Sequence, residues 1–400
     1  MTIKYHTLGC RVNAVETDRL KRDLAALGFN EVSAPEEAEV IVINTCSVTK
    51  QSDRKSAQLI RSSLRQQAKV IAMGCYVPEE LFEEVLFIPN EDKHRAPQLI
   101  SDHIGQLDET GSLLTQAERT RSFIKVQDGC NNFCSYCIIP YLRGRERSMS
   151  QTEILSEVDR ALAGGHREVV LSGIHLSGYG RDTNTSLIEL IEAIGQKDGI
   201  DRIRLGSLEQ AIITPDFLDR LNRVDAFCPH FHLSLQSGSD AVLKRMNRHY
   251  TTPEFLDKME MIREAFPEVA ITTDIIVGFS GETEEEFQES IDFVKQARFS
   301  KVHVFPFSKR EGTRAALLSD LPGNIKKERG RIMRELTEQI QAEILEEWIG
   351  REVEVLTEDS YGYTRHYLPV YYEQALEPNQ LVRLKITGRK ELSLYGLPIL

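Results

Sequence analysis

The sequence predicts an α/β protein in three parts: an open α/β domain, a partial barrel of six β/α units, and a small all-β barrel at the C-terminus. Two observations support this prediction. From the N-terminus to Phe307, short apolar runs alternate with helix-like stretches, as in parallel sheets. After Gly350, apolar and polar residues alternate instead, as in a small antiparallel barrel. The expected parts are an N-terminal domain, a linker, a barrel domain and a C-terminal domain at residues 1–110, 111–121, 122–348 and 349–400.

Each strand expected in the N-terminal domain is followed by a cysteine. Helix-like stretches at 15–27 and 52–67 separate these strands, which indicates that the strands run parallel. Because the carboxyl ends of parallel strands lie at one edge of a sheet, the three thiols are expected to converge there. The three pairs of strand and cysteine are residues 3–7 with Cys10, 40–43 with Cys46, and 70–73 with Cys75.

Six strand candidates follow in the central part, with helical patterns between them. Six β/α units are too few to close an eight-stranded barrel, so we expect an open barrel with its active site at the carboxyl ends of the strands. A long charged helix is expected at 325–348. The strand candidates are 123–127, 168–172, 202–206, 231–235, 271–277 and 301–307, and the helices between them are expected at 152–163, 187–194, 215–221, 253–264 and 284–297.

Composition limits the classes of function. With 400 residues, 41% of them hydrophobic and 28% charged, the chain is expected to form folded domains. The N-terminus does not resemble a secretory signal and no run approaches the roughly 18 apolar residues of a spanning helix, so we expect a cytoplasmic protein. A net charge of -12 argues against nucleic-acid binding unless a local basic surface exists. Seven cysteines in such a compartment favour metal ligation or thiol chemistry over disulfides.

Three closely spaced cysteines follow the first strand of the central part. Cys130, Cys134 and Cys137 form a Cys-x3-Cys-x2-Cys pattern. Thiolates at this spacing can hold three irons of a [4Fe-4S] cluster, so the fourth iron has no protein ligand and is open to chemistry. A structural zinc ion is the alternative, but zinc normally takes four ligands, and no fourth Cys or His follows at zinc spacing.

This triad resembles that of the radical S-adenosylmethionine (SAM) superfamily. The resemblance implies that the open iron binds the amino and carboxylate groups of SAM, and that electron transfer yields a 5′-deoxyadenosyl radical that abstracts hydrogen from the substrate. Tyr136 matches the aromatic residue that the family places near the adenine. Further positions that resemble cofactor contacts are Gly173, Glu209, Gln236 and Arg248. The alternative is that Gly173 simply ends a strand and that the other three are polar residues of the barrel mouth.

The widely spaced cysteines allow two interpretations. On spacing alone, Cys10, Cys46 and Cys75 could be buried structural thiols. Their surroundings, Thr-Leu-Gly-Cys10-Arg-Val-Asn13, Asn-Thr-Cys46-Ser-Val-Thr and Met-Gly-Cys75-Tyr, resemble the N-terminal domain of the methylthiotransferases. That resemblance implies an auxiliary [4Fe-4S] cluster whose open iron holds the sulfur to be inserted. It extends over nearly the whole chain and implies a C-terminal RNA-binding barrel of the TRAM type, whereas the seventh cysteine, Cys228, is expected to be structural.

Residues 44–55 and 302–313 resemble the family branch that modifies N6-threonylcarbamoyladenosine beside the anticodon of tRNA. The resemblance implies a 2-methylthio product, with tRNA and a low-potential electron donor such as a flavodoxin or ferredoxin as partners. Isopentenyladenosine in tRNA and a ribosomal-protein aspartate are the alternative substrates. An electron carrier or an RNA-binding protein with structural clusters is the alternative from another class, although simple carriers use four cysteines per cluster. The chain departs from the family at Ser280, where Pro is common, and in a short segment at 77–90.

A basic surface is expected beside the widely spaced cysteines. On an ideal helix, five cations that follow Cys46 share an arc of roughly 100°, while Leu59, Ile60 and Leu64 point elsewhere. Phosphates bound there would bring RNA toward the auxiliary cluster, and the alternative is a solvated helix face. The expected RNA contacts are Lys50, Arg54, Arg61, Arg65 and Lys69, with Arg143, Arg145 and Arg147 as a second basic cluster. Arg143 or Arg145 is also expected to accommodate the threonylcarbamoyl group.

Overall fold

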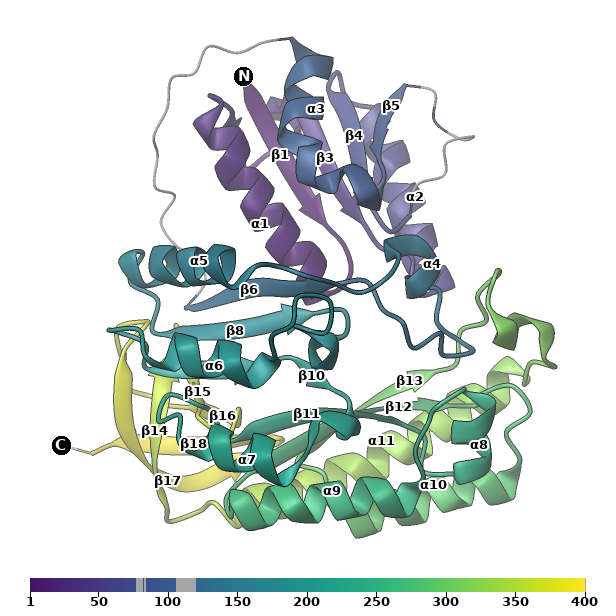
Figure 1. Ribbon diagram of the computed structural model, residues 1–400, viewed down its shortest axis with the longest axis vertical. Helices are drawn as coiled ribbons and strands as arrows, with labels where there is room; N and C mark the ends of the chain where they lie inside the picture. Colours follow the sequence, from purple (N-terminus) through teal and green to yellow (C-terminus); the bar gives the residue numbers. More distant parts are fainter. Residues whose placement is uncertain (77–81, 83, 106–119, 400) are drawn as a thin grey trace.

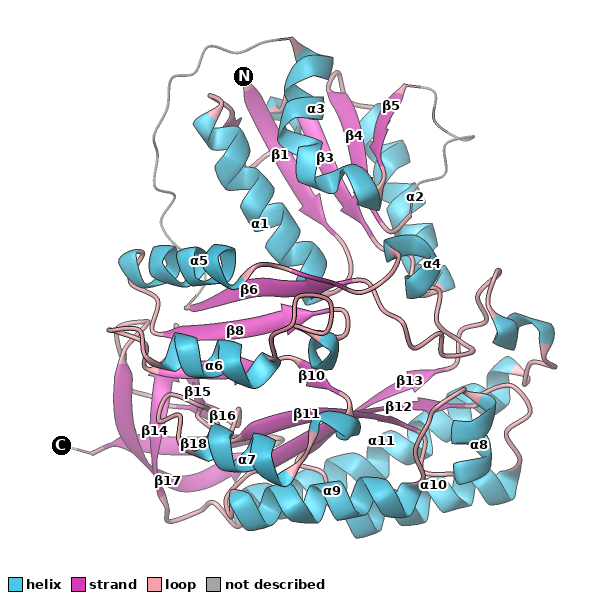
Figure 2. Cartoon of the chain, viewed as in Figure 1, coloured by secondary structure: helices cyan, strands magenta, loops and turns pink. Residues whose placement is uncertain are grey.

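The computed structural model describes residues 1–76, 82, 84–105 and 120–399. Three units follow one another along the chain and are stacked in space (Figure 1). The N-terminal α/β unit lies on one side of a central barrel, and a small β-barrel packs against the central barrel elsewhere. Figure 2 shows helices around the outside of the central strands and a last unit built from strands.

The N-terminal unit is a five-stranded parallel sheet in the order β2-β1-β3-β4-β5. Its elements are β1 (Thr2–Thr7), α1 (Arg11–Ala26), β2 (Asn30–Glu31), β3 (Val40–Thr45), α2 (Lys50–Leu64), β4 (Lys69–Gly74), β5 (Val85–Ile88) and α3 (Ala96–Ile104), with 3-10 helices at Pro35–Glu37 and Asn90–Arg95. The three expected strands are present as β1, β3 and β4. The sequence analysis did not predict the two edge strands.

Apolar side chains on both faces hold this sheet between helices. Val42 and Ile71 pack on one face with Leu20 of α1, and Ile43 packs on the other face with Ile60 of α2. Because successive residues of a strand point to opposite faces, continuous apolar runs need a layer of helices on each side. The carboxyl ends of β1, β3 and β4 consequently meet at one edge of the unit, which faces the central barrel (Figure 1).

The central unit is an open, partial barrel, and the fold predicted from the sequence is confirmed. Its strands lie in two sheets, β7-β6-β8-β9 and β10-β11-β12-β13, and β9 is joined to the segment before β11 by a parallel bridge between Ile203 and Phe227. The six expected strands run parallel. The elements are β6 (Arg121–Asp128), α4 (Ile139–Arg143), β7 (Arg147–Ser148), α5 (Gln151–Ala163), β8 (Glu168–Gly173), α6 (Leu187–Gly195), β9 (Arg202–Leu205), β10 (Ser207–Leu208), α7 (Pro215–Asn222), β11 (His230–Gln236), α8 (Asp240–Arg245), α9 (Thr252–Ala265), β12 (Ala270–Val277), α10 (Glu284–Ala297), β13 (Lys301–Pro306) and α11 (Gly323–Glu346).

Local sequence signals fix where the outer helices begin. Four of them, α5, α6, α9 and α10, start with a capping box. In each box a Ser or Thr side chain accepts a hydrogen bond from the N–H of a Glu three residues later, and the Glu carboxylate accepts one from the first residue's N–H. Behind these helices lies one large apolar core, which includes Phe231, Phe255 and Phe299.

The C-terminal unit is a closed barrel in the order β14-β15-β16-β18-β17, as predicted. Its strands are β14 (Glu352–Thr357), β15 (Tyr361–Thr364), β16 (Pro369–Tyr371), β17 (Leu381–Lys390) and β18 (Ser393–Pro398). Two fully buried arginines of β9 attach this unit to the central barrel. Arg202 donates to the Tyr363 carbonyl at 2.9 Å, and Arg204 donates to the Arg365 carbonyl at 3.0 Å. The small barrel therefore lies against the end at which the central strands begin.

Two expectations concern segments that the structure describes only in part. Of the linker expected at 111–121, residues 111–119 lie outside the described residues, and Arg121 already belongs to β6. Of the short segment at 77–90, residues 77–81 and 83 lie outside the described residues, and the remainder contains β5. Ser280 is 1% exposed, and its hydroxyl has no hydrogen-bond partner among the residues that the structure describes. No helix within the described residues is long and apolar enough to span a membrane.

Candidate active site

The cysteines of the N-terminal unit lie where β1, β3 and β4 end. Cys46 and Cys75 directly follow β3 and β4, whose last residues, Thr45 and Gly74, are paired in register. Both cysteines are buried, whereas Cys10, between β1 and α1, is exposed. Burial raises the pKa of the Cys46 thiol, and the nearby Cys75 and Cys10 thiols raise this pKa further. The three thiols therefore lie close together, as the strand pattern predicts.

Gly9 and Asn13 shape the space around these thiols. Gly9 has a φ of +100°, and a Cβ there would lie 2.9 Å from the Cys46 sulfur, so the position requires glycine. The Asn13 side-chain amide, in the first turn of α1, donates to the Thr45 carbonyl at 2.8 Å, and it also donates to the Leu8 carbonyl, on the loop before α1, at 2.8 Å. Asn13 thereby ties the loop that carries Cys10 to the end of β3.

The closely spaced triad, Cys130, Cys134 and Cys137, lies on the loop between β6 and α4. Gly129 opens this loop with a φ of +70°, and a Cβ there would lie 1.9 Å from the Arg145 carbonyl oxygen. The Cys137 N–H donates to the Cys134 carbonyl at 3.0 Å, so these two cysteines share one turn. Burial raises the pKa of the Cys130 thiol to about 11 and that of the Cys137 thiol to about 12. Since iron binds the thiolate, a bound metal would displace the thiol protons here.

Arg248 and Glu209 form an ion pair beside this triad. The Arg248 guanidinium donates to the Cys134 sulfur at 3.4 Å, to the Glu209 carboxylate, and to the Ser234 carbonyl at 3.0 Å. Asn132, on the cysteine loop, donates to Glu209 at 3.4 Å. The structure thus brings two of the expected cofactor residues into contact with the cysteine loop.

The other expected cofactor residues lie at neighbouring strand ends or on the same loop. Tyr136 packs edge-on against Phe279, with 6.4 Å between ring centres. Gly173 ends β8, where a Cβ would lie 3.0 Å from the Gln127 side chain. Gln236 ends β11 with a φ of +72°, a left-handed conformation that is strained for this residue type. This edge of the barrel is therefore crowded with the residues that the sequence analysis selected.

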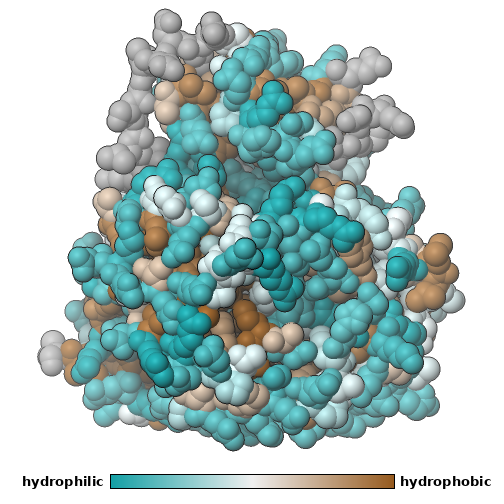
Figure 3. Space-filling model, viewed as in Figure 1, coloured by the Kyte–Doolittle hydropathy of each residue, from teal (hydrophilic) through white to brown (hydrophobic). Residues whose placement is uncertain are grey.

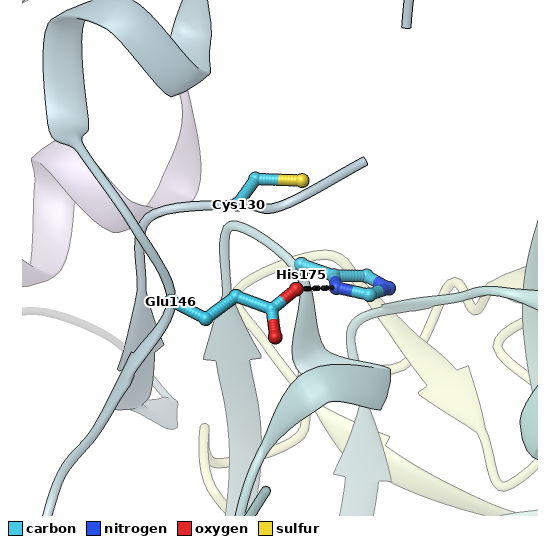
Figure 4. Close-up of side chains that lie close together, drawn as sticks. All are labelled: Cys130, Glu146 and His175. Atoms are coloured by element: carbon cyan, nitrogen blue, oxygen red, sulfur yellow. Dashed lines mark hydrogen bonds and ion pairs between the residues drawn. The ribbon is translucent and has the colours of Figure 1, made fainter. Parts of the chain in front are cut away.

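A Glu–His pair that the sequence analysis did not select lies beside Cys130 (Figure 4). The Nδ1 atom of His175 lies 2.6 Å from a Glu146 oxygen, and both side chains are 6% exposed. One ligand atom from each of these three residues lies within 4.8 Å of the others. The second ring nitrogen of His175 is buried and has no hydrogen-bond partner among the described residues. It is therefore available to a bound group.

Ligand spacing distinguishes a cluster from a single ion. Within the described part of the chain, two groups place three ligand atoms from Cys, His, Asp or Glu within 4.8 Å of one another: the Cys130 group of Figure 4, and the group of His232, Asp274 and His303. Neither cysteine triad has this compactness. A single zinc ion holds thiolates at about 2.3 Å, so its ligands lie closer together than 4.8 Å. The thiol positions therefore argue against one zinc ion per triad.

Arg143 is buried between the N-terminal unit and the barrel, which corrects the prediction that it contacts RNA or the substrate. Its side chain is 1% exposed. The guanidinium donates to Glu16 of α1 at 2.9 Å, to Asp128 at 3.0 Å and to the Asn13 side-chain oxygen at 2.6 Å. An arginine that is buried between two units is not exposed to a phosphate.

Glu16 is the centre of this interdomain network. Burial raises the pKa of its carboxyl, but the charges of Lys93, Lys125 and Arg143 outweigh burial and hold the pKa well below its usual range. The N-terminal unit contributes Glu16 and Lys93, and the barrel contributes the other two cations. The network therefore fixes the two cysteine-bearing units against each other.

The expected cationic stripe is exposed on the surface after Cys46, with one change. Arg65 is the C-cap of α2, and Lys69 begins β4, so Lys69 does not belong to the helix. No member of the stripe forms an ion pair with a described residue. The five exposed cations are Lys50, Arg54, Arg61, Arg65 and Lys69. Arg145 is also exposed and lies over the Phe133 ring at 4.6 Å.

The sequence analysis assigned no role to Asn13, Glu16, Glu146 or His175. Asn13 belongs to the segment around Cys10 that was compared with the family, so that motif could have identified it. The others are single side chains whose partners are remote in the sequence. His175 and Glu146, for example, are 29 positions apart, so no local pattern pairs them.

Two family models match the chain. The model described as "Radical SAM superfamily" matches residues 124–294, and that described as "Uncharacterized protein family UPF0004" matches residues 2–92. Among solved structures, the cobalamin-dependent SAM radical enzyme OxsB has a TM-score of 0.53 at 13% identity, with 84% of this chain and 56% of that chain covered. The radical SAM methyltransferase TsrM from Kitasatospora setae has a TM-score of 0.55 at 12% identity, with 76% and 72% covered. These likenesses establish the fold.

Curated relatives are more similar in sequence. The threonylcarbamoyladenosine tRNA methylthiotransferase MtaB of Bacillus subtilis is 35% identical, with 96% of this chain and 93% of that protein covered. The protein of the same name from Aquifex aeolicus is 38% identical, with 96% and 100% covered. The tRNA-2-methylthio-N(6)-dimethylallyladenosine synthase of Caldicellulosiruptor saccharolyticus is 33% identical, with 99% and 90% covered. This chain therefore belongs to the methylthiotransferase family of radical SAM enzymes.

Proposed function

We propose that this enzyme attaches a methylthio group to C2 of N6-threonylcarbamoyladenosine beside the anticodon of tRNA. The observation that carries the proposal is a pair of convergent cysteine triads in a chain 35% and 38% identical to two proteins named for this substrate. As a radical SAM enzyme, the chain uses a [4Fe-4S] cluster and SAM. The relative named for N(6)-dimethylallyladenosine makes that nucleoside the second candidate.

The chemistry of the target atom explains why two clusters are needed. An adenine C2–H bond resists acid, base and nucleophilic chemistry, so its replacement by sulfur calls for a radical and for a nearby sulfur source. When bound, the first cluster and SAM supply the radical that takes the hydrogen atom, the second cluster supplies the sulfur, and a second SAM supplies the methyl group. The protein must therefore hold two open irons beside one base.

We assign the ligands of the first cluster to Cys130, Cys134 and Cys137. The loop fits this role because Arg248 donates to one of its sulfurs and so provides a compensating positive charge. We assign the contacts with SAM to Arg248, Glu209 and the strand-end residues around them. Tyr136 offers a ring for the adenine, and Gly173 and Gln236 complete the set.

We assign an auxiliary [4Fe-4S] cluster to Cys10, Cys46 and Cys75. Three thiols at the ends of parallel strands provide three ligands and leave one iron for sulfur. The seventh cysteine, Cys228, is fully buried, and its pKa is raised by burial although Arg204 lowers it. It precedes β11, at the end where the central strands begin, whereas both triads follow the carboxyl ends of strands, so it does not complete either triad.

The proposed partners follow from the roles assigned to the three units. We propose that residues 1–110 hold the auxiliary cluster, that 122–348 carry the radical chemistry, and that the TRAM-like barrel at 349–400 binds tRNA together with the cationic stripe and Arg145. A low-potential carrier such as a flavodoxin or ferredoxin supplies electrons. The protein is assigned to the cytoplasm because tRNA is located there.

Mass spectrometry of tRNA nucleosides from a deletion strain tests the proposed substrate. We expect 2-methylthio-N6-threonylcarbamoyladenosine to be absent and its unthiolated precursor to accumulate. Plasmid-borne wild type should restore the nucleoside, and a plasmid encoding Cys134→Ala should not. If this nucleoside persists while the isopentenyl counterpart disappears, the second candidate substrate is correct instead.

A further inference from the structure

The second compact group of ligand atoms lies on three neighbouring strands of the barrel and has no role in the assignments above. It consists of His232 on β11, Asp274 on β12 and His303 on β13, and we call it the His–Asp group. Asp274 and His303 are paired in register. The His232 Nε2 atom lies 3.1 Å from an Asp274 oxygen, and the two imidazole centres are 5.8 Å apart. Thr272 Oγ1 lies 2.9 Å from the other nitrogen of His232 and fixes that ring.

The His–Asp group faces the interior of the barrel. Val302 and Val304, on either side of His303, pack against the core beneath the helices. Since successive residues of a strand point to opposite faces, His303 projects to the inner side together with Lys301 and Phe305. Phe305 is 51% exposed and lies two residues nearer the carboxyl end of β13, toward the edge that bears the cysteine loop. The face in Figure 3 is mainly hydrophilic and is hollowed near its middle, where apolar side chains are visible.

Arg11 brings a positive charge to this group. It directly follows Cys10, donates to the Tyr367 hydroxyl at 3.0 Å, and lies over the rings of Phe123 and Tyr367 at 5.4 and 5.9 Å. It forms no ion pair with a described residue. Tyr367 connects Arg11 to the group: its ring lies 5.1 Å from the His230 ring, and Thr272 Oγ1 lies within hydrogen-bond distance of both His230 and His232. Burial lowers the pKa of His303, and the charge of Arg11 adds to that lowering, in agreement with this placement.

The local charge favours an anion over a metal ion. The His–Asp group has one carboxylate, which already pairs with His232, and two fixed cations, Arg11 and Lys301, lie close to it. A divalent cation would be repelled by both cations, whereas an anion would be attracted. A guanidinium without a carboxylate partner is well suited to bind a carboxylate through two parallel hydrogen bonds.

We propose that Arg11 and the His–Asp group bind the N6 substituent of the target adenosine: Arg11 binds its carboxylate, and the His–Asp group binds its hydroxyl. This inference rests on the proposed function, because the threonylcarbamoyl group carries one carboxylate and one hydroxyl. The exposed ring of Phe305 offers a surface on which the adenine stacks. The base then lies toward the cysteine loop, and its substituent reaches deeper into the barrel.

Anticodon-arm RNAs that carry threonylcarbamoyladenosine, or its neutral methyl ester, test the contact with Arg11. The ester removes the negative charge and keeps nearly the same shape. We expect the wild-type kcat/KM to favour the acid over the ester by roughly tenfold to 100-fold, the usual value of a hydrogen bond to a charged group. Arg11→Gln should abolish this preference by lowering activity on the acid alone.

A third RNA, in which glycine replaces threonine, tests the His–Asp group because it lacks the hydroxyl. His303→Leu should lower kcat/KM on the threonine RNA severalfold and leave the glycine RNA less affected. Arg19→Gln, an exposed position on the same helix, is the matched control and should keep every preference. Each result is a ratio of the kcat/KM values of two RNAs, measured with one enzyme preparation. A partial loss of a cluster lowers both values by the same factor and leaves the ratio unchanged.

Four outcomes would overturn this assignment. The contact between Arg11 and the carboxylate would be disproved if the wild type were equally active on the acid and the ester. It would also be disproved if Arg11→Gln lost equal activity on both RNAs. Either result would leave the proposed function intact. A zinc ion retained by the wild-type holoenzyme and lost in His303→Leu would identify a metal site instead. Wild-type enzyme that cleaves SAM and modifies neither RNA would contradict the proposed function itself.

Discussion

At the scale of single residues, the two cysteine triads are held in place by different means. Cys46 and Cys75 are buried where two paired strands end, so the sheet positions them directly. Cys130 and Cys137 lie on a loop whose path depends on Gly129. Because the two triads lie on different units, loss of one triad's ligands should leave the other triad able to bind its cluster.

Replacement of all three closely spaced cysteines by Ala should reduce the iron of anaerobically reconstituted protein from about eight to about four per chain. It should also abolish formation of 5′-deoxyadenosine from SAM. The same replacement of Cys10, Cys46 and Cys75 should remove a similar amount of iron but retain SAM cleavage, because cleavage needs only the first cluster. Iron analysis and chromatography of the nucleoside products measure both effects. Cys228→Ala is the control with unchanged iron, and one zinc ion per triad would contradict the assignment.

Arg143 and Arg145 show what a local pattern can and cannot predict about a site. Cysteine ligands are recognisable because one cluster draws them from a short loop or from successive strand ends. Both arginines are basic neighbours of the same loop, yet Arg143 is buried and Arg145 is exposed. The difference arises from Glu16, which pairs with Arg143 across 127 positions of sequence. When the partner comes from another domain, the sequence next to the arginine gives no sign of it.

At the scale of elements, the type and order of the main strands and helices could be predicted from the periodicity of the sequence. The two edge strands of the N-terminal sheet could not. The apolar runs of β3 and β4 are buried on both faces, so their pattern is unambiguous. β2 has only two residues, both exposed, and carries no such pattern. β13 was predicted as a strand, but the role of its inner face could not be predicted. That role depends on His232 and Asp274, which lie on other strands.

The helix α2 allows a charge-reversal test of RNA binding. Changing Arg54, Arg61 and Arg65 to Glu should weaken tRNA binding, because each lost phosphate contact removes counterion release. The slope of log K against log salt should become shallower by up to about three. Filter binding over a salt series measures this, and the cluster content should not change, since none of the three residues is a ligand.

The matched control for α2 reverses three exposed arginines at the ends of the outer barrel helices, Arg160, Arg223 and Arg298. Both triple variants change the net charge by the same amount, so a general electrostatic effect would appear in both. An unchanged salt slope in the α2 variant would show that the stripe is only a solvated helix face.

At the scale of the whole molecule, the buried network around Glu16 couples the two cysteine-bearing units. Arg143 donates both to Glu16 and to Asn13, and Asn13 holds the loop of Cys10. Arg143 also donates to Asp128, which lies two residues before Cys130. One arginine is thus in contact with the supports of both triads. The proposed reaction needs both triads beside one base, and this network is one contact that holds the two units in a fixed geometry at their junction.

Glu16→Gln should lower the free energy of unfolding at pH 7 by about 3 kcal/mol, because buried cations lose their counter-charge. The folded-state pKa of Glu16 lies well below its usual value of 4.5, so the carboxylate stabilises the fold above that pH and loses this effect as the pH falls through the folded-state pKa. The difference between wild type and variant should therefore be constant near neutral pH and shrink below pH 4.5, in urea unfolding of the apoprotein followed by circular dichroism. Glu157→Gln removes the partner of two exposed arginines, Arg22 at the same junction and Arg160, whose side chains are 43% and 58% exposed. This substitution should lower the free energy of unfolding by less than about 1 kcal/mol. A difference of equal size for the two variants would show that the Glu16 network does not hold the units together.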